Sequence, residues 1–194
     1  MRLILASRSP RRADLLTAAG IAFDVSGVDV DEDFRPGEKP EHAVARLAEV
    51  KAIAAAELHP DTIVLGADTT VVVDGEALAK PDDAEDAARM LRLLSGRSHD
   101  VLTGVCLVSE ERKFVYVETT RVSMAALDEA EIAWYVSTRE PFDKAGAYAV
   151  QGLASRFIEG IEGSYANVVG LPICRVYEVL KALGCDILEG KKSP

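Results

Sequence analysis

The sequence is poor in the residues that build disulfide frameworks and zinc sites. Its 194 residues include only 3 cysteines and 3 histidines, and the cysteines stand far apart, at Cys106, Cys174 and Cys185. No C-x-x-C pair occurs, and an odd number of separated cysteines does not match a disulfide scaffold. We therefore expect reduced, buried cysteines in a cytoplasmic protein.

Long apolar runs and an excess of positive charge are also missing. No run reaches the roughly 18 apolar residues of a membrane-spanning helix, so we expect no membrane association. The apolar start at residues 2–6 is interpreted as a strand and not as a signal peptide. Lys and Arg number 22 against 32 Asp and Glu, which gives a net charge of −10. This acidity argues against nucleic-acid binding, and an anionic substrate would need local cations or a metal ion.

Three familiar catalytic fingerprints do not occur. The chain has no G-x-x-x-x-G-K-[ST] loop, no G-x-G-x-x-G fingerprint and no G-x-S-x-G elbow. Function therefore has to be read from weaker local signals at the junctions between predicted helices and strands.

Strand and helix patterns alternate along most of the chain. Apolar and β-branched runs predict strands at residues 2–6, 21–27, 62–66, 69–73, 76–79, 100–109, 113–124 and 155–160. Capping and Pro signals predict helices that begin near Pro10, Pro40, Asp82, Asp128 and Pro172. Long antiparallel strands in the second half favour a mixed sheet. We predict an α/β fold with two lobes and a cleft, in one domain over residues 1–188, with a disordered tail at 189–194.

The segment Ser7-Arg8-Ser9-Pro10-Arg11-Arg12 joins the first predicted strand to the first helix. A helix N-terminus offers free N–H groups and the positive end of its dipole, which together bind anions. Arg11 and Arg12 lie in this first turn, where the dipole disfavours cations. A phosphate chain would compensate for this, whereas the alternative is a pair of solvated surface arginines.

The segment Gly66-Ala67-Asp68-Thr69 follows the predicted strand 62–66. Ligands of open α/β sheets bind at the carboxyl ends of strands, and a carboxylate there can hold Mg²⁺ or take a proton from water. Asp68 can equally be a plain turn residue. Lys80-Pro81 follows the next predicted hairpin, which can return Lys80 toward the strand end at Asp68. This nearby lysine favours a ligand site over a plain turn.

Three further segments carry weaker signals. Small residues surround a charged pair in Asp143-Lys144-Ala145-Gly146-Ala147-Tyr148, which indicates a ligand contact or only a tight turn. Glu32 lies in an acidic loop that can supply a metal ligand, although such loops are often only solvated. Lys51 lies at the edge of the apolar face of its helix, where its ammonium can enter a cleft or snorkel to water.

Together and in order, these segments resemble the Maf family. The resemblance covers about residues 2 to 184. Its matching stretches are Ser7-x-Ser9-Pro10-Arg11-Arg12-x-Asp14-Leu15-Leu16, Glu32, Lys51-Ala52, Gly66-Ala67-Asp68-Thr69, Lys80-Pro81, Ser95-Gly96-Arg97, Asp143-Lys144-Ala145-Gly146-Ala147-Tyr148 and Gly163-Ser164-Tyr165-x-Asn167-Val168-Val169-Gly170-Leu171-Pro172. Arg8 stands where the family usually has a small residue, which leaves the contribution of this side chain to phosphate binding open.

The resemblance implies an elongated mixed α/β fold similar to that of the inosine-triphosphate (Ham1-like) pyrophosphatases, and a homodimer. It implies hydrolysis of a nucleoside triphosphate to the monophosphate and pyrophosphate. Asp68 matches the proton acceptor of the family, and Arg12, Thr69 and Gln151 match positions that set base specificity. The Gln151-Gly152 pair resembles the branch that prefers dTTP and UTP, and the branch that acts on 7-methyl-GTP ranks second.

The implied chemistry is attack by water on the α-phosphorus while pyrophosphate leaves. A divalent cation, Mg²⁺ or Mn²⁺, and nearby Arg and Lys side chains would neutralise the growing charge, and Asp68 would deprotonate the water. The predicted substrate-binding residues are Ser7, Arg11, Arg12, Lys51, Thr69, Lys80 and Gln151, and the predicted metal ligands are Glu32 and Asp68. Two other interpretations stay open: a non-enzymatic regulator of septum formation, and a phosphatase that releases single phosphates.

Overall fold

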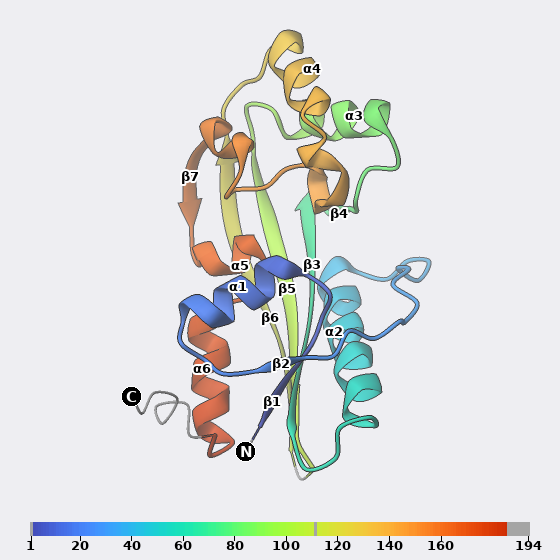
Figure 1. Ribbon diagram of the computed structural model, residues 1–194. Helices are drawn as coiled ribbons and strands as arrows, with labels where there is room; N and C mark the ends of the chain where they lie inside the picture. Colours follow the sequence, from blue (N-terminus) through green and yellow to red (C-terminus); the bar gives the residue numbers. More distant parts are fainter. Residues whose placement is uncertain (1, 111, 186–194) are drawn as a thin grey trace. The chain divides into compact units, whose positions relative to one another are not determined.

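The computed structural model describes residues 2–110 and 112–185 (Figure 1). The predicted disordered tail at 189–194 lies outside the described residues. Seven strands form a sheet in the order β2-β1-β3-β5-β6-β7, and β4 pairs with β3. The strands are β1 (Leu3–Ala6), β2 (Asp24–Val25), β3 (Ile63–Val73), β4 (Glu76–Leu78), β5 (Ser98–Val108), β6 (Lys113–Met124) and β7 (Ile158–Glu162). Since parallel and antiparallel pairs both occur, the predicted mixed α/β sheet is confirmed.

Six α-helices and three 3₁₀ helices connect the described strands. The α-helices are α1 (Pro10–Ala18), α2 (Pro40–Ala56), α3 (Ala84–Leu94), α4 (Glu129–Ser137), α5 (Tyr165–Val169) and α6 (Ile173–Ala182), and the 3₁₀ helices are η1 (Glu140–Asp143), η2 (Ala145–Ala147) and η3 (Leu153–Phe157). The chain divides into two compact units. The first unit contains the residues up to Asp68, Thr103–Glu118 and the chain from Gly170 onward, and the second contains Thr69–Leu102 and Thr119–Val169.

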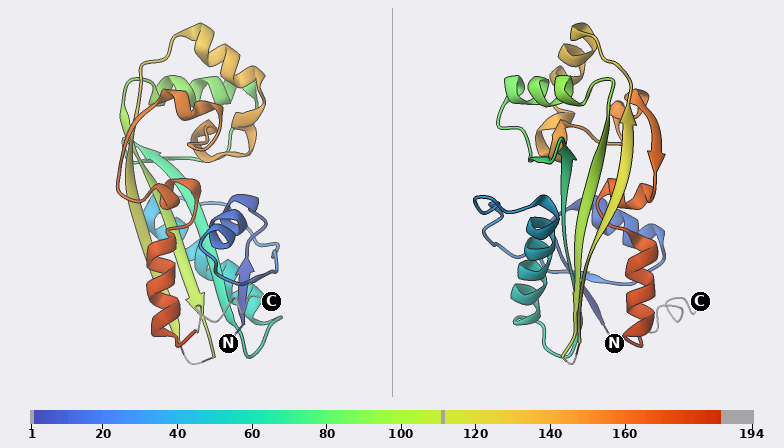
Figure 2. Two further views of the ribbon diagram at one scale, coloured as in Figure 1. Left: turned by 60° about the vertical axis from the view of Figure 1, so that its left-hand side comes forward. Right: turned by 180° about the vertical axis from the view of Figure 1, so that it is seen from behind.

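In the first unit, strand β1 is buried on both faces. Alternate side chains of a strand point to opposite faces, so Leu3 and Leu5 join one core cluster and Ile4 and Ala6 another. The first cluster contains side chains of α1 and α6, and the second contains the alanines of α2. Figure 2 shows the same arrangement, with α2 on one side of the strands and α1 and α6 on the other. The continuous apolar run of residues 3–6 is therefore the pattern of a strand covered on both sides.

Helix α2 lies very close to the sheet because two glycines face it. A Cβ added to Gly66 would lie 2.2 Å from the carbonyl oxygen of Ala48, and one added to Gly104 would lie 2.1 Å from that of Val44. Both neighbours are backbone atoms of α2, so no side-chain movement could relieve the clash. The alanines that α2 presents to the sheet allow the same close approach.

Several predicted boundaries are wrong. The strand expected at 21–27 is only Asp24–Val25, and the strand expected at 155–160 begins at Ile158, after η3. The strands expected at 62–66 and 69–73 form one continuous strand of 11 residues, because Asp68 and Thr69 stay extended and lead into the β-branched run paired with β4. The cap of α3 is Asp83, whose side chain accepts a bond from the backbone N–H of Asp86, one residue after the start predicted near Asp82. The capping box of Asp128 and Glu131 at α4 is confirmed.

The core of the second unit contains a buried histidine. His99 is 3% exposed, and its Nε2 lies 2.7 Å from Oη of Tyr148. Its Nδ1 is buried without a hydrogen-bond partner among the described residues. Burial lowers the pKa of His99 from 6.5 to about 4, against the weaker opposing effect of Asp100. The neutral imidazole is therefore the form that packs in this core.

Replacing His99 tests this burial through the pH dependence of stability. The unfolded chain binds a proton at His99 below about pH 6.5 and the folded chain only near pH 4, so stability is lost as pH falls through this range. We expect the His99 contribution to the free energy of unfolding to fall by about 2 kcal/mol between pH 7.5 and pH 5. In His99→Gln this part of the loss disappears, which urea unfolding at both pH values measures. An equal pH dependence in both proteins would show that the pKa of His99 does not change on folding.

Candidate active site

The parallel strands of the first unit end at one edge of the sheet. Strand β1 pairs in parallel with β2 and with β3, and its last pair with β3 joins Ala6 to Gly66. Asp68 therefore lies just past the end of β1, although β3 itself continues. The prediction that Asp68 follows a strand end is wrong for β3, but its position at the carboxyl edge of β1 preserves the reason for expecting a ligand there.

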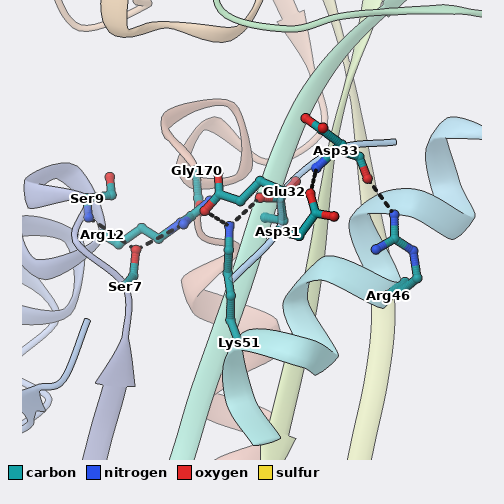
Figure 3. Close-up of polar contacts among 10 residues, drawn as sticks. Ser7, Ser9, Arg12, Asp31, Glu32, Asp33, Arg46, Lys51 and Gly170 are labelled. Atoms are coloured by element: carbon teal, nitrogen blue, oxygen red, sulfur yellow. Dashed lines mark hydrogen bonds and ion pairs between the residues drawn. The ribbon is translucent and has the colours of Figure 1, made fainter. Parts of the chain in front are cut away.

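Lys51 connects two carboxylates at this edge. Its Nζ donates to Oδ1 of Asp68 at 2.7 Å. The same Nζ forms an ion pair with Oε1 of Glu32 at 2.8 Å (Figure 3). Lys51 is 7% exposed, so its ammonium would be costly to bury without these partners. Glu32 comes from the loop after β2, Asp68 from β3 and Lys51 from α2. Three distant parts of the sequence thus meet at the ammonium group of Lys51.

The strand spacing explains why Asp68 faces Lys51. Val64, Gly66 and Asp68 alternate along β3 and so share a face, and Gly66 directly underlies α2. Asp68 continues this face beyond the point where the backbone of α2 rests on Gly66. The close helix approach allowed by Gly66 therefore positions the Lys51–Asp68 pair.

Arg12 is held between the β1–α1 junction and a distant segment. Its Nε donates to the carbonyl oxygen of Gly170 at 2.9 Å, and its Nη1 donates to Oγ of Ser7 at 3.0 Å (Figure 3). Ser7 also accepts a bond from the backbone N–H of Ser9, at 3.2 Å, just before α1 begins at Pro10. Arg12 is 9% exposed, so it is a buried cation and not the solvated surface residue of the alternative interpretation.

The charge of Arg12 is part of the same electrostatic group. Burial lowers the pKa of its guanidinium, Asp68 and Glu32 raise it, and Arg11 lowers it. Arg12, which binds Ser7, thus interacts electrostatically with both predicted metal ligands, and Lys51 forms an ion pair with each of them. Arg11 belongs to this electrostatic group through its charge. The role of each of these residues toward a substrate stays a prediction.

The chemistry of this group suits a hard divalent cation shared with a ligand. Two carboxylates converge on one positive charge, and Mg²⁺ typically uses one or two protein carboxylates together with phosphate oxygens and water. Within residues 2–110 and 112–185, no group of three or more His, Cys, Asp or Glu side chains could hold a metal ion by itself. Glu32 and Asp68 stay the predicted metal ligands.

The other predicted binding residues belong to the second unit. Thr69 follows Asp68 on β3, and Lys80 is exposed after β4. The carbonyl oxygen of Ala79, beside Lys80, accepts a bond from the N–H of Gly146 at 3.1 Å. Lys80 therefore lies beside the segment Asp143-Lys144-Ala145-Gly146-Ala147-Tyr148, and the role of either toward a substrate stays a prediction. Gln151 is exposed, at a turn closed by a bond from the N–H of Gly152 to the carbonyl of Ala149.

A carboxylate that the sequence analysis did not single out holds this turn. Glu140 accepts bonds from Oη of Tyr135 at 2.8 Å and from the N–H of Leu153 at 3.0 Å. Its carboxylate also lies over Gly152, where an added Cβ would be 2.3 Å from Oε1. The glycine after Gln151 is thus explained by the close approach of Glu140. Gly152 was the only signal in the sequence that pointed to this contact.

Residues 2–183 match the sequence family described as Maf-like protein. The chain belongs to the Maf family. This family member is 52% identical over 184 residues to a protein of Koribacter versatilis named dTTP/UTP pyrophosphatase, with 95% of each chain covered. It is 51% identical over 189 residues to a protein of the same name from Symbiobacterium thermophilum, with 97% of each chain covered. The predicted family is confirmed.

A solved structure supports the predicted fold of this Maf family member. The Ham1 protein of Staphylococcus aureus superimposes with a TM-score of 0.53 at 15% sequence identity, over 94% of this chain and 100% of that chain. At this identity the likeness concerns the fold alone. The expected similarity to the Ham1-like fold is confirmed.

Gly66→Ala tests whether the close packing of α2 holds the site together. The new Cβ would lie 2.2 Å from a backbone oxygen and 2.8 Å from a backbone nitrogen of α2, so the helix would have to move. We expect a loss of about 3 kcal/mol in the free energy of unfolding, measured by urea denaturation. Gly160→Ala is the matched control, because nothing lies within 4 Å of its added Cβ. Equal stability of the two variants would contradict the packing argument.

Proposed function

We propose that this Maf family chain hydrolyses dTTP and UTP to the nucleoside monophosphate and pyrophosphate. The observation that carries the proposal is Lys51, whose ammonium contacts both Glu32 and Asp68 beside the buried guanidinium of Arg12. Although the chain is acidic, two buried cations, Lys51 and Arg12, lie near carboxylates at this position. This arrangement suits a triphosphate that binds as its complex with a metal ion. The relatives named dTTP/UTP pyrophosphatase support the choice of pyrimidine nucleotides.

In the proposed reaction, a water oxygen bonds to the α-phosphorus and the bond to the α–β bridging oxygen breaks. Asp68 accepts the proton of the water. Lys51 occupies Oδ1 of Asp68, so we assign the proton to Oδ2. Pyrophosphate leaves with the bridging oxygen and its electron pair.

Cationic groups stabilise the charge that grows on the leaving pyrophosphate. Arg11 and Arg12, at the start of α1, and Lys51 supply fixed positive charge in the first unit. Lys80 stays a predicted substrate-binding residue. Glu32 and Asp68 would hold a divalent cation, Mg²⁺ or Mn²⁺, which supplies Lewis-acid stabilisation of the phosphate oxygens. Thr69 and Gln151 are assigned to base recognition. Homodimer formation and a cytoplasmic location stay predictions, and no helix in the described part of the chain is long and apolar enough to span a membrane.

The position of solvent oxygen in the products tests the reaction. With UTP, Mg²⁺ and ¹⁸O-labelled water, we expect one pyrophosphate per UMP and the label in UMP, because water attacks the α-phosphorus. Phosphorus NMR resolves both products and the isotope shift. Orthophosphate as the first product would instead identify a phosphatase, and a label in pyrophosphate would place the attack on the β-phosphorus.

A nucleotide panel tests the substrate preference. We expect kcat/KM for dTTP and UTP to exceed that for 7-methyl-GTP under the same conditions. The opposite order would assign the chain to the other branch of the family. Absence of hydrolysis with every nucleotide and either metal would favour the non-enzymatic regulator.

Asp68→Asn tests the assignment of the base. The amide keeps the size of the side chain but cannot accept the proton, so we expect kcat to fall by about 10²–10⁴-fold. Circular dichroism and urea unfolding check that the variant is folded. Full activity in a folded Asp68→Asn protein would show that another group deprotonates the water.

A further inference from the structure

The loop that carries Glu32 is tied to α2 by one arginine. Arg46 Nε donates to Oε1 of Glu38 at 2.8 Å, and Arg46 Nη2 donates to Oε2 at 2.7 Å. The side chains of Arg46 and Glu38 are 19% and 12% exposed, so this two-bond pair is largely shielded from water. Parallel N–H···O bonds of this kind fix orientation as well as distance.

The same guanidinium also binds the backbone next to Glu32. Nη2 of Arg46 donates to the carbonyl oxygen of Asp33 at 3.0 Å (Figure 3). The N–H of Asp33 donates to Oδ1 of Asp31 at 2.9 Å, which closes a small turn around Glu32. Glu38 in turn accepts a bond from the N–H of Arg35 at 3.0 Å. Arg46 therefore holds the loop on the C-terminal side of Glu32 at two points.

Asp31, Glu32 and Asp33 are exposed, whereas Val30 and Phe34 on either side of them are half-buried. These three acidic residues form no helix or strand. Ordering an exposed loop costs conformational entropy, which the polar contacts of Arg46 and Lys51 help to offset. Since Lys51 and Arg46 both project from α2, the helix presents one side chain to Glu32 and another to the residue after it.

The charges of the pair are balanced. The hydrogen bond from Arg46 lowers the pKa of Glu38 to about 2, and the bond to Glu38 raises the pKa of Arg46. Weaker attractions from Asp31 and Asp68 also raise the pKa of Arg46. Because Glu38 compensates Arg46 locally, the pair orders the loop without adding net positive charge beside a site suited to a divalent cation.

We propose that Arg46 is a positioning residue, which with Glu38 fixes the loop so that the carboxylate of Glu32 meets Lys51 and the cation that accompanies the nucleotide. This inference rests on the proposed function for the identity of the ligand. Arg46 touches neither reacting atoms nor substrate in this assignment. It acts through Glu32.

Arg46→Lys is the test variant, because it keeps the charge but loses the two-bond fork. Arg92→Lys is the matched control: Arg92 makes the same pair of bonds to Glu129, at 2.8 and 2.7 Å, in the second unit. Hydrogen–deuterium exchange measures the order of residues 28–38, and electron paramagnetic resonance of free Mn²⁺ measures metal binding with a non-hydrolysable UTP analogue. Neither measurement depends on turnover.

We expect Arg46→Lys to speed exchange in residues 28–38 and to weaken Mn²⁺ binding by about 10-fold, as loss of an outer-shell contact does. The Mn²⁺ concentration for half-maximal rate should rise similarly, with kcat at saturating metal changed less than about 3-fold. In a Glu32→Gln background, Arg46→Lys should weaken Mn²⁺ binding no further, because the effect passes through Glu32. Arg92→Lys should match the wild type in both measurements.

Unchanged exchange in Arg46→Lys would overturn the proposal, and so would faster exchange with unchanged Mn²⁺ binding. A further loss of Mn²⁺ binding in the Glu32→Gln background, or no Mn²⁺ binding by the wild type, would also overturn it. Failure of the proposed function gives a different result. The wild type would then not release pyrophosphate from UTP. Loop exchange and Mn²⁺ affinity could still be compared between the wild type and Arg46→Lys.

Discussion

The ammonium of Lys51 is the charge on which the first unit's site depends. A buried lysine is costly unless carboxylates compensate it, and both Asp68 and Glu32 lie within 2.8 Å of its Nζ. Removing Lys51 would leave two carboxylates near each other without the ammonium that both of them contact. The three residues therefore depend on one another electrostatically. They come from a strand, a loop and a helix, which the fold brings to one edge of the sheet.

That convergence is a consequence of backbone packing. Parallel pairing of β1 with β2 and β3 sends their carboxyl ends to the same side, and glycines in β3 and β5 let α2 rest directly on the sheet. Lys51 then reaches Asp68 from the helix, while Arg46 on the same helix holds the loop of Glu32. Helix α2 thus positions both carboxylates. Lys51 contacts Asp68 and Glu32, and Arg46 also binds the loop that carries Glu32.

Much of the fold follows from local patterns, because buried strands and capped helices have short-range signatures. The apolar run of residues 3–6, the Pro10 and Pro40 helix starts and the capping box at Asp128 are examples. Asp68 shows where such patterns fail: Gly66-Ala67 looks like the end of a strand, yet β3 continues through Asp68 to the residues that pair with β4. The sequence pattern placed Lys51 at the edge of the apolar face of its helix. Its contacts with Asp68 and Glu32 form only through tertiary packing, so the pattern did not predict them. Arg46 and Glu140 were missed because each binds both side-chain and backbone groups that only the folded chain places around it.

A double-mutant cycle on kcat for UTP hydrolysis tests the central claim that Lys51 and Asp68 act as one unit. The single variants are Lys51→Met and Asp68→Asn, and circular dichroism confirms that each protein is folded. Residues that act as a unit show strongly non-additive losses, so the double variant should be no slower than the slower single variant. A double variant slowed by the product of the two single losses would show that the residues contribute independently, which would contradict the account.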